Sequence, residues 1–303
     1  MNTNKTLAQQ VNEIKNARMS AVKKAIALVK LGLTKDEAEW IAKASMPAPA
    51  PRAPRFAFTF GVEIECVGCR FHEFRSAAQN NGLSVYDQFY YNHHDMPMYK
   101  LTTDSSVRGE NPAECVTPAL NGNPNGFRSL EACCKSLAEI GASANRSCGL
   151  HVHIGAANLS DREYCNVFVN YMRLESAIES FLAPSRRGRY AQWCASLRNY
   201  EDRVLNASTK AEMRTALHGD RYHRVNPCAY DAHKTIEFRQ HQGSTNFAKI
   251  SAWVKFLGKL VKYSKTDRLA ENIDRIEDIP FLTQAEKRVF IRRRAEFEAR
   301  QAI

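Results

Sequence analysis

The chain has 303 residues, of which 44% are hydrophobic and 25% charged, and a formal net charge of +11. This composition excludes an intrinsically disordered chain and is typical of a globular protein with a sizeable core. No apolar run approaches the roughly 20 residues that a membrane-spanning helix needs, and the polar N-terminus lacks the apolar core of a secretion signal, so we expect a cytoplasmic protein without a membrane partner.

The nine cysteines do not have the arrangement of a disulfide framework or of a zinc site. They form no even, regularly spaced set of the kind found in disulfide-rich secreted chains. Cys66 and Cys69 form one C-x-x-C, but the second pair that a structural zinc site uses is missing from the sequence. We therefore interpret the cysteines as buried thiols.

The first 45 residues predict a helical N-terminal extension. In the segment AVKKAIALVKLGL, lysines fall on one side of a helix and four apolar residues on the other, namely Val22, Ile26, Val29 and Leu31. Thr34 precedes a further helix, and Glu37 follows it at the spacing of a capping box. We expect a helical hairpin over residues 1–45.

The proline-rich segment MPAPAPRAPR, residues 46–55, predicts a stiff linker, because proline fixes φ and removes a hydrogen-bond donor. We expect the main domain over residues 56–265 and a charged helical tail over residues 266–303. Strand and helix patterns follow each other without strict alternation, which predicts an α+β fold around an antiparallel sheet. The expected strands are residues 56–68, 113–118, 149–156 and 234–243, and the expected helices are residues 126–141, 161–182 and 247–264.

Three of the expected strands carry a pair of polar residues two positions apart. The pairs are Glu63 and Glu65, His151 and His153, and Glu237 and Arg239. Side chains two apart on a strand point to the same face of the sheet, and the residues between these pairs are apolar. One such pair alone is typical of a solvated sheet face. Three pairs with complementary chemistry predict a sheet that is covered by helices on one face and carries a functional site on its open face.

The residue types in these pairs favour metal and phosphate chemistry. Carboxylates and imidazoles bind divalent cations, and a surplus of carboxylates favours Mg²⁺ or Mn²⁺ over zinc. An added arginine suits phosphate, and Mg²⁺ usually arrives with substrate phosphates attached. The open face therefore predicts nucleotide chemistry.

The motifs FGVEIE, TDSSV with AECVTP, CGLHVHIG, PSRR, RYHRVN and TIEFRQHQGS occur in this order along the chain. Together they resemble the amidoligase family, which is related to the carboxylate-amine ligases of the glutamine synthetase and γ-glutamylcysteine synthetase fold. The resemblance covers roughly residues 56–260. It implies a glutamine-synthetase-like catalytic domain that uses ATP and Mg²⁺ (or Mn²⁺) to join a carboxylate and an amine into an amide or isopeptide bond through an acyl phosphate.

The resemblance also implies roles for individual residues. The metal ligands would be Glu63, Glu65, Glu114, His151 and Glu237. Arg239 would contact the nucleotide phosphates, with His153 on the same face, and Glu63, Glu65, His151 and Arg239 would form the catalytic group. Further positions that match the family's nucleotide site are Arg186, Arg187, Arg221 and Asn226.

Two features of the expected site stay open. The turn that usually reads Asp-Gly-Ser in the family is Asp104-Ser105-Ser106 here, so we expect a local difference, and Asp104 itself is either a turn residue or part of the site. The group that deprotonates the amine is either a carboxylate or His153.

Two other functions remain as alternatives. A metal-dependent hydrolase would use the same Glu and His face to activate water, although Arg239 and the surplus of carboxylates argue against it. A nucleic-acid or scaffold-binding protein would explain the basic charge, but we find no helix-turn-helix, zinc-finger or RNP-like motif in the sequence. For a ligase, the carboxylate and amine could belong to an amino acid, a peptide, a protein side chain or a cell-wall fragment, and the sequence leaves the oligomeric state open.

Overall fold

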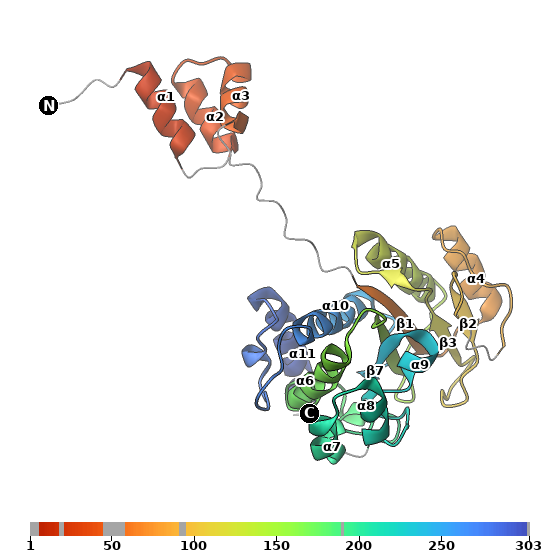
Figure 1. Cartoon of the computed structure of the whole chain (residues 1–303). Coiled ribbons are helices and arrows are strands. Elements are labelled where there is room, and N and C mark those ends of the chain that lie inside the picture. Colours follow the sequence, from red (N-terminus) through yellow and green to blue (C-terminus); the bar gives the residue numbers. More distant parts are fainter. Residues whose placement is uncertain (1–5, 18–20, 45–57, 91–94, 189–190, 302–303) are drawn as a thin grey trace. The chain divides into compact units, whose positions relative to one another are not determined.

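The protein consists of two compact units, Met1–Arg55 and Phe56–Ile303. The computed structural model describes residues 6–17, 21–44, 58–90, 95–188 and 191–301 (Figure 1). The expected linker, residues 46–55, lies outside the described residues. Among the described residues, no helix has the length and the apolar character that crossing a membrane requires.

The described part of the first unit holds three helices, where a hairpin of two was expected. They are α1 (Leu7–Asn16), α2 (Ala21–Lys30) and α3 (Lys35–Ala44). A small core joins them, built from Leu28, Ala38 and Ala42. The capping box before α3 is confirmed, because the Thr34 N–H donates to the Glu37 carboxylate at 3.0 Å and the Glu37 N–H donates to the Thr34 hydroxyl at 3.3 Å.

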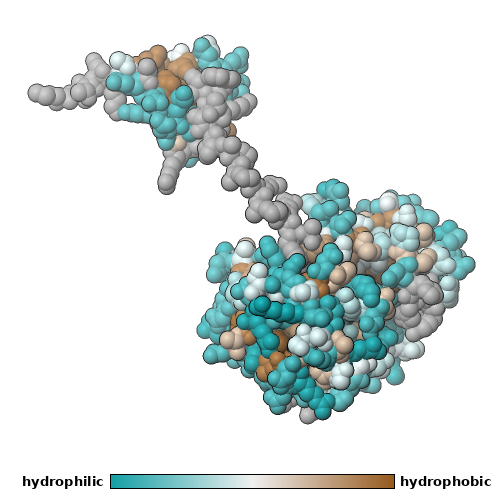
Figure 2. Space-filling model, viewed as in Figure 1, coloured by the Kyte–Doolittle hydropathy of each residue, from teal (hydrophilic) through white to brown (hydrophobic). Residues whose placement is uncertain are grey.

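Helix α2 faces the opposite way from the prediction. Three residues of its predicted apolar face are exposed, at 69%, 53% and 45% for Val22, Ile26 and Val29. Lys24 is instead buried, and its Nζ donates to the Lys15 carbonyl at 2.6 Å, in the last turn of α1. Because a cation is favoured at the C-terminal end of a helix, Lys24 can lie inside the unit beside Leu28. The surface of this unit therefore carries apolar side chains (Figure 2).

The second unit is built on an antiparallel sheet of seven strands, in the order β2-β3-β1-β5-β7-β6, with β4 also pairing with β1. This confirms the predicted α+β fold. The strands are β1 (Thr59–Cys66), β2 (Lys100–Thr102), β3 (Ala113–Val116), β4 (Leu120–Asn121), β5 (Gly149–Gly155), β6 (Val225–Asn226) and β7 (Thr235–Gln242). The four expected strands are β1, β3, β5 and β7. The other three have only two or three residues each, too few to show an alternating pattern.

Helices cover one face of this sheet (Figure 1). The main ones are α5 (Pro124–Glu139), α6 (Asp161–Ser180), α10 (Phe247–Ser264) and α11 (Gln284–Gln301). Val62, Val152 and Phe238 from the strands and Trp253 from α10 are fully buried between the layers. Ser160 caps the N-terminus of α6, since its hydroxyl accepts the Glu163 N–H. The shorter helices are α4 (Phe71–Asn80), α7 (Glu201–Asn206), α8 (Lys210–Ala216) and α9 (Ala229–His233).

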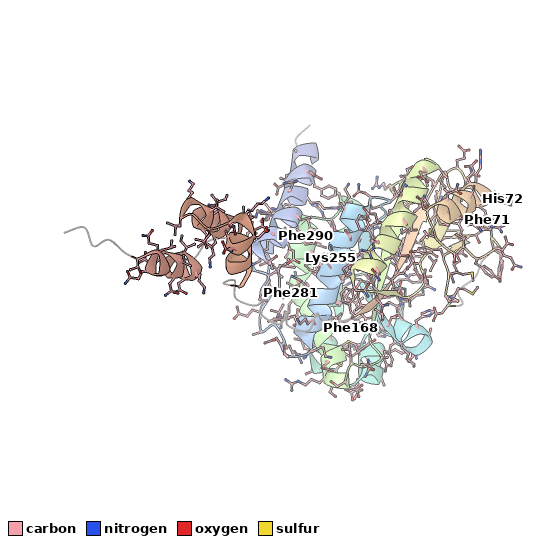
Figure 3. All side chains as sticks on the ribbon, turned by 90° about the horizontal axis from the view of Figure 1, so that it is seen from above. Phe71, His72, Phe168, Lys255, Phe281 and Phe290 are labelled. Carbon is pink, nitrogen blue, oxygen red and sulfur yellow. The ribbon has the colours of Figure 1, made fainter. Side chains whose placement is uncertain are left out.

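The C-terminal segment belongs to the core of the second unit. Phe290 of α11 packs against Phe181 and Phe256, with ring centroids 4.6 and 5.5 Å apart. Phe281 also packs on Phe256, with ring centroids 5.5 Å apart. Figure 3 labels Phe281 and Phe290 in this part of the unit. Aromatic pairs of this kind each contribute about 0.5–1.5 kcal/mol beyond their buried area. Residues 266–303 are thus part of the helical layer.

The nine cysteines are all free thiols, and eight of them are buried. Cys115 and Cys133 approach each other across the sheet–helix boundary, with their sulfur atoms 3.5 Å apart. Burial and this mutual contact raise the pKa of the Cys115 thiol well above its ordinary value. These cysteines act as small apolar core residues, as expected.

Candidate active site

The strand register brings the three predicted pairs together on the face that the helices leave open. The cross-strand partners are Glu63 with His151, Glu237 with His153, and Glu65 with Glu114. Directly opposed residues of antiparallel strands have Cβ atoms about 4.5–5.5 Å apart. The pairing of four strands, β3, β1, β5 and β7, therefore brings these six side chains together as one cluster.

Strand β7 contains a bulge at Arg239 and Gln240, and the two side chains lie on opposite sides of the strand. The β5–β7 register shifts between Leu150 and Val152, because β7 has one residue more than β5 there. Gln240 turns into the core, where its side-chain oxygen accepts from the Tyr171 hydroxyl at 2.8 Å. Arg239 remains on the open face and lines the cavity there.

His151 lies at the centre of the carboxylates. Its Nδ1 is 2.9 Å from Glu63 Oε2 and 3.7 Å from Glu237 Oε1, and its Nε2 is 3.4 Å from Glu65 Oε1. The side chains of His151, Glu65 and Glu237 are each only 5–6% exposed, whereas Glu63 is 24% exposed. One imidazole thus contacts carboxylates from two different strands.

The two ring nitrogens of His153 face Thr235 and Glu63. Its Nδ1 is hydrogen-bonded to the Thr235 hydroxyl at 2.8 Å. Its Nε2 is buried and, among the described residues, has no hydrogen-bond partner, although Glu63 Oε1 lies 3.3 Å away. Burial acts against the charged imidazole, but the Glu63 carboxylate outweighs it and raises the pKa of His153. The Nε2 nitrogen would serve as a metal ligand only in the neutral imidazole, after its proton is lost.

The ionised form of Glu114 is disfavoured by its position in this cluster. Burial and the charges of Glu63, Glu65 and Asp104 raise the pKa of Glu114 well above its ordinary value. Like charges gathered in a buried place disfavour ionisation, and a cation among them would reverse that effect.

The donor atoms fit divalent cations. Three sets of side chains each bring one ligand atom per residue within 4.8 Å of the others: Glu63, Glu114 and His151; Glu63, His153 and Glu237; and Glu65, Asp104 and Glu114. Carboxylate-rich sets with at most one imidazole suit hard cations such as Mg²⁺ or Mn²⁺. The sets overlap but do not coincide, so the face has room for more than one cation.

Asp104 serves both as a turn residue and as a member of this cluster. Its Oδ1 accepts the Ser106 N–H at 2.7 Å, which stabilises the turn. Its carboxylate also belongs to the third set above. Ser105, at the position where the resemblance implies a glycine, does not adopt a positive φ. The substitution therefore introduces no backbone strain at this position.

Arg239 is held in place by Glu237. Its Nη1 is paired with Glu237 Oε1, and the Asn226 side-chain amide donates to the other carboxylate oxygen at 2.5 Å. Burial alone would raise the pKa of Glu237, but the charge of Arg239 lowers it below the ordinary value. The guanidinium also lies over the Tyr222 ring, 5.8 Å from its centroid. Arg239 is thus a fixed positive charge beside the carboxylates of the sheet face.

These side chains line a cavity of about 510 Å³, here called the acidic cavity. A second cavity of about 320 Å³, the Lys100 cavity, adjoins it and shares Glu63, Glu114, His153 and His233. Lys100 on β2 is 6% exposed, and burial lowers its pKa. Lys100 and His233 were not predicted, because three-residue β2 and five-residue α9 leave no recognisable sequence pattern.

The four other predicted positions differ in where they lie. Arg186 and Asn226 are buried and line the acidic cavity, and exposed Arg221 stands at its edge over the Tyr222 ring. Arg187 lines neither cavity: its Nε donates to the Leu182 carbonyl at 2.8 Å, and its guanidinium lies over the Phe297 ring of α11.

The family described as "putative amidoligase enzyme" matches residues 57–261. This range runs from the start of β1 nearly to the end of α10 and contains every residue that lines the acidic cavity. A comparison with curated proteins finds no match.

Proposed function

This chain belongs to the amidoligase family, and we propose that its open sheet face joins a carboxylate to an amine in an ATP-dependent reaction. The observation that carries the proposal is the meeting of four glutamates, one aspartate, three histidines and three arginines in a single cavity. Such a set provides cation ligands and a phosphate-binding group together. A simple hydrolytic zinc site would need fewer carboxylates and no arginine.

The reaction needs two covalent steps, because a carboxylate is a poor electrophile. In the first, a carboxylate oxygen attacks the γ-phosphorus of ATP, the bond from that phosphorus to the β–γ bridging oxygen breaks, and ADP leaves with the electron pair. In the second, the amine nitrogen attacks the acyl carbon, the C–O bond to the phosphoryl group breaks, and inorganic phosphate leaves. The nitrogen loses a proton, so that an amide, ADP and phosphate are formed.

The acidic residues would hold Mg²⁺ or Mn²⁺, which when bound neutralise the charge on the phosphate oxygens. Arg239 donates to the same oxygens from the side of β7, and Glu237 and Asn226 keep its guanidinium in position. A hydrogen-bond donor that is held in place before the reaction stabilises the transition state more than a donor that must first reorganise. The nucleoside lies in the Lys100 cavity, where Met96 and Met98 provide apolar walls.

A second imidazole is placed to accept the amine proton. His233 packs edge-on against His153, with ring centroids 5.7 Å apart, and borders both cavities. Its Nδ1 lies 2.9 Å from the Asp95 carboxylate. An imidazole oriented by a carboxylate is a common form of general base. We therefore add His233 to His153 and the carboxylates as a candidate for this role.

Calorimetric titration of Mg-ATP tests the proposal without knowledge of the acid or the amine. We expect saturable, Mg²⁺-dependent binding to the wild type, and binding at least about tenfold weaker, or roughly 1.4 kcal/mol, in Glu63→Gln and in Glu237→Gln. Glu131→Gln, on the exposed side of α5, is the matched control and should bind like the wild type.

A wild-type protein that binds zinc or manganese but no ATP would contradict the ligase and favour the hydrolase. Equal ATP affinity in the wild type and both glutamine variants would place the nucleotide away from the open sheet face.

A further inference from the structure

A third cavity of about 510 Å³ adjoins the acidic cavity and has the opposite charge. We call it the arginine cavity, after Arg108, Arg146 and Arg186, which line it together with four serines. No acidic side chain is among its described lining residues. It shares a wall with the acidic cavity, made of Ser105, Ser106, Ser147, Arg186 and Trp193. A single extended ligand can therefore reach both cavities.

Arg186 is a buried cation that lacks an anionic partner. It is only 6% exposed and lies beside Cys194 in the cavity lining, yet no carboxylate of the described residues forms an ion pair with it. Arg224 shows how this protein otherwise buries an arginine: it is 1% exposed and pairs with Glu175 at 3.0 Å and with Glu179. An unpaired buried charge costs several kcal/mol, so Arg186 is expected to meet an anion that comes from outside the chain.

The guanidinium of Arg186 lies where the two cavities meet. A Cβ atom placed on Gly149 would be 3.1 Å from Arg186 Nη2 and 3.3 Å from Glu65 Oε1. The cation and the metal-binding carboxylate therefore approach the same backbone position on β5, which only glycine leaves free. An anion bound to Arg186 would be next to the cations that Glu65 helps to hold.

Two further arginines stand on loops that are tied together. The Arg108 N–H donates to the Ser147 hydroxyl at 2.9 Å, and the Asn145 side-chain amide donates to the Arg108 carbonyl at 2.6 Å. These contacts join the loop after Asp104 to the loop that carries Arg146. Both arginines are exposed, and no carboxylate of the described residues forms an ion pair with either side chain. The mouth of the cavity is therefore positive.

We propose that the arginine cavity binds a second carboxylate of the acid substrate, and that this substrate is an acidic peptide with glutamyl or aspartyl side chains. The inference rests on the proposed function, in which the reacting carboxylate lies in the acidic cavity. In the proposed function the bound cations and Arg239 contact the nucleotide phosphates, so the arginine cavity is left for another anion. A guanidinium group matches a carboxylate with two parallel hydrogen bonds, and three such groups suit a ligand with several carboxylates.

The test uses the full chain and the tripeptide Glu-Glu-Glu, with Gln-Gln-Gln as its neutral counterpart. Binding is measured in the presence of Mg²⁺ and without nucleotide, through the fluorescence of Trp193, which is 40% exposed and lines the cavity. We expect saturable, salt-sensitive binding of Glu-Glu-Glu alone, weakened about tenfold in Arg108→Gln/Arg146→Gln. The control Arg162→Gln removes an exposed arginine that lines none of the three cavities, and it should bind like the wild type.

Three results would overturn the inference: equal binding of both tripeptides, full affinity in the double variant, or arginine-dependent binding of inorganic triphosphate without binding of Glu-Glu-Glu. The last would identify a phosphate site. Titration of Mg-ATP into the same proteins separates this inference from the proposed function. A wild type that binds Glu-Glu-Glu but not ATP would support the arginine cavity and refute the ligase. A wild type that binds ATP but not Glu-Glu-Glu would refute the cavity alone.

Discussion

At Glu114, burial and three neighbouring carboxylates act together against the ionised form, and the pKa of this side chain is raised well above its ordinary value of 4.5. The folded state therefore binds this proton more tightly than the unfolded state does. Glu114 stabilises the fold fully below pH 4.5, and this contribution is lost as the pH rises through the raised pKa. Without a cation, the ionisation of Glu114 thus lowers the stability of the fold at neutral pH.

Glu114→Gln keeps the volume of the side chain and removes its charge. We expect the variant to unfold at a higher temperature than the wild type at neutral pH without divalent cations, by about 2–4 °C for each kcal/mol recovered. We also expect it to lose part of the stabilisation that Mg²⁺ gives the wild type. Thermal unfolding from mildly acidic to mildly alkaline pH, with and without Mg²⁺, measures both effects. A variant that is less stable than the wild type at every pH would contradict this account.

At the scale of single elements, strands with a regular alternation were predictable and short or irregular elements were not. Strands β1, β5 and β7 each have seven or eight residues with apolar and polar positions in turn, so their polar pairs could be assigned to one face. Lys100 lies on a three-residue strand, which has no period to detect. The bulge that separates Arg239 from Gln240 depends on pairing with β5, which the sequence of β7 alone does not contain.

The sequence could not show which of two adjacent arginines lines the cavities or which face of α2 is buried, because both depend on packing. Arg186 and Arg187 are adjacent in the sequence, but the 3-10 turn Pro184–Arg186 directs the first into the cavities, and the second packs on Phe297. Helix α2 offers an apolar stripe and a set of lysines, and the small core of the first unit takes Lys24 with Leu28. Helical periodicity identifies a stripe but not which neighbour it meets.

The packing of α11 gives an element-scale prediction. Phe290 is 5% exposed and contacts two aromatic rings of the core, whereas its neighbour Val289 is 50% exposed. We expect Phe290→Ala to lower the free energy of unfolding of the second unit by about 3–5 kcal/mol. Val289→Ala, on the same turn of the helix, should change it by no more than about 0.5 kcal/mol. Denaturant unfolding followed by circular dichroism compares the two, and similar small effects would mean that α11 is a peripheral tail.

At the scale of the whole molecule, more than half of the net positive charge lies in the first unit, whereas the three cavities lie in the second. Residues 1–55 contain ten Lys and Arg and four Asp and Glu, so that six of the eleven net positive charges belong to the smaller part of the chain. The family match and the three cavities all lie within the second unit. Each unit also has its own hydrophobic core. The excess of basic residues therefore says little about the open sheet face and more about the helical extension.

A chain reduced to residues 56–303 should keep the second unit's properties. Because the two cores share no residue, we expect its unfolding temperature to stay within about 2 °C of the value for the same unit in the full chain, a shift below that of a 1 kcal/mol change. Its affinity for Mg-ATP should be unchanged, since no residue of the first unit lines the acidic or Lys100 cavity among the described residues. Its retention on a polyanionic column should fall, because six positive charges are removed. A truncated chain that retains its fold but loses Mg-ATP binding would show that the helical extension contributes to the active site itself.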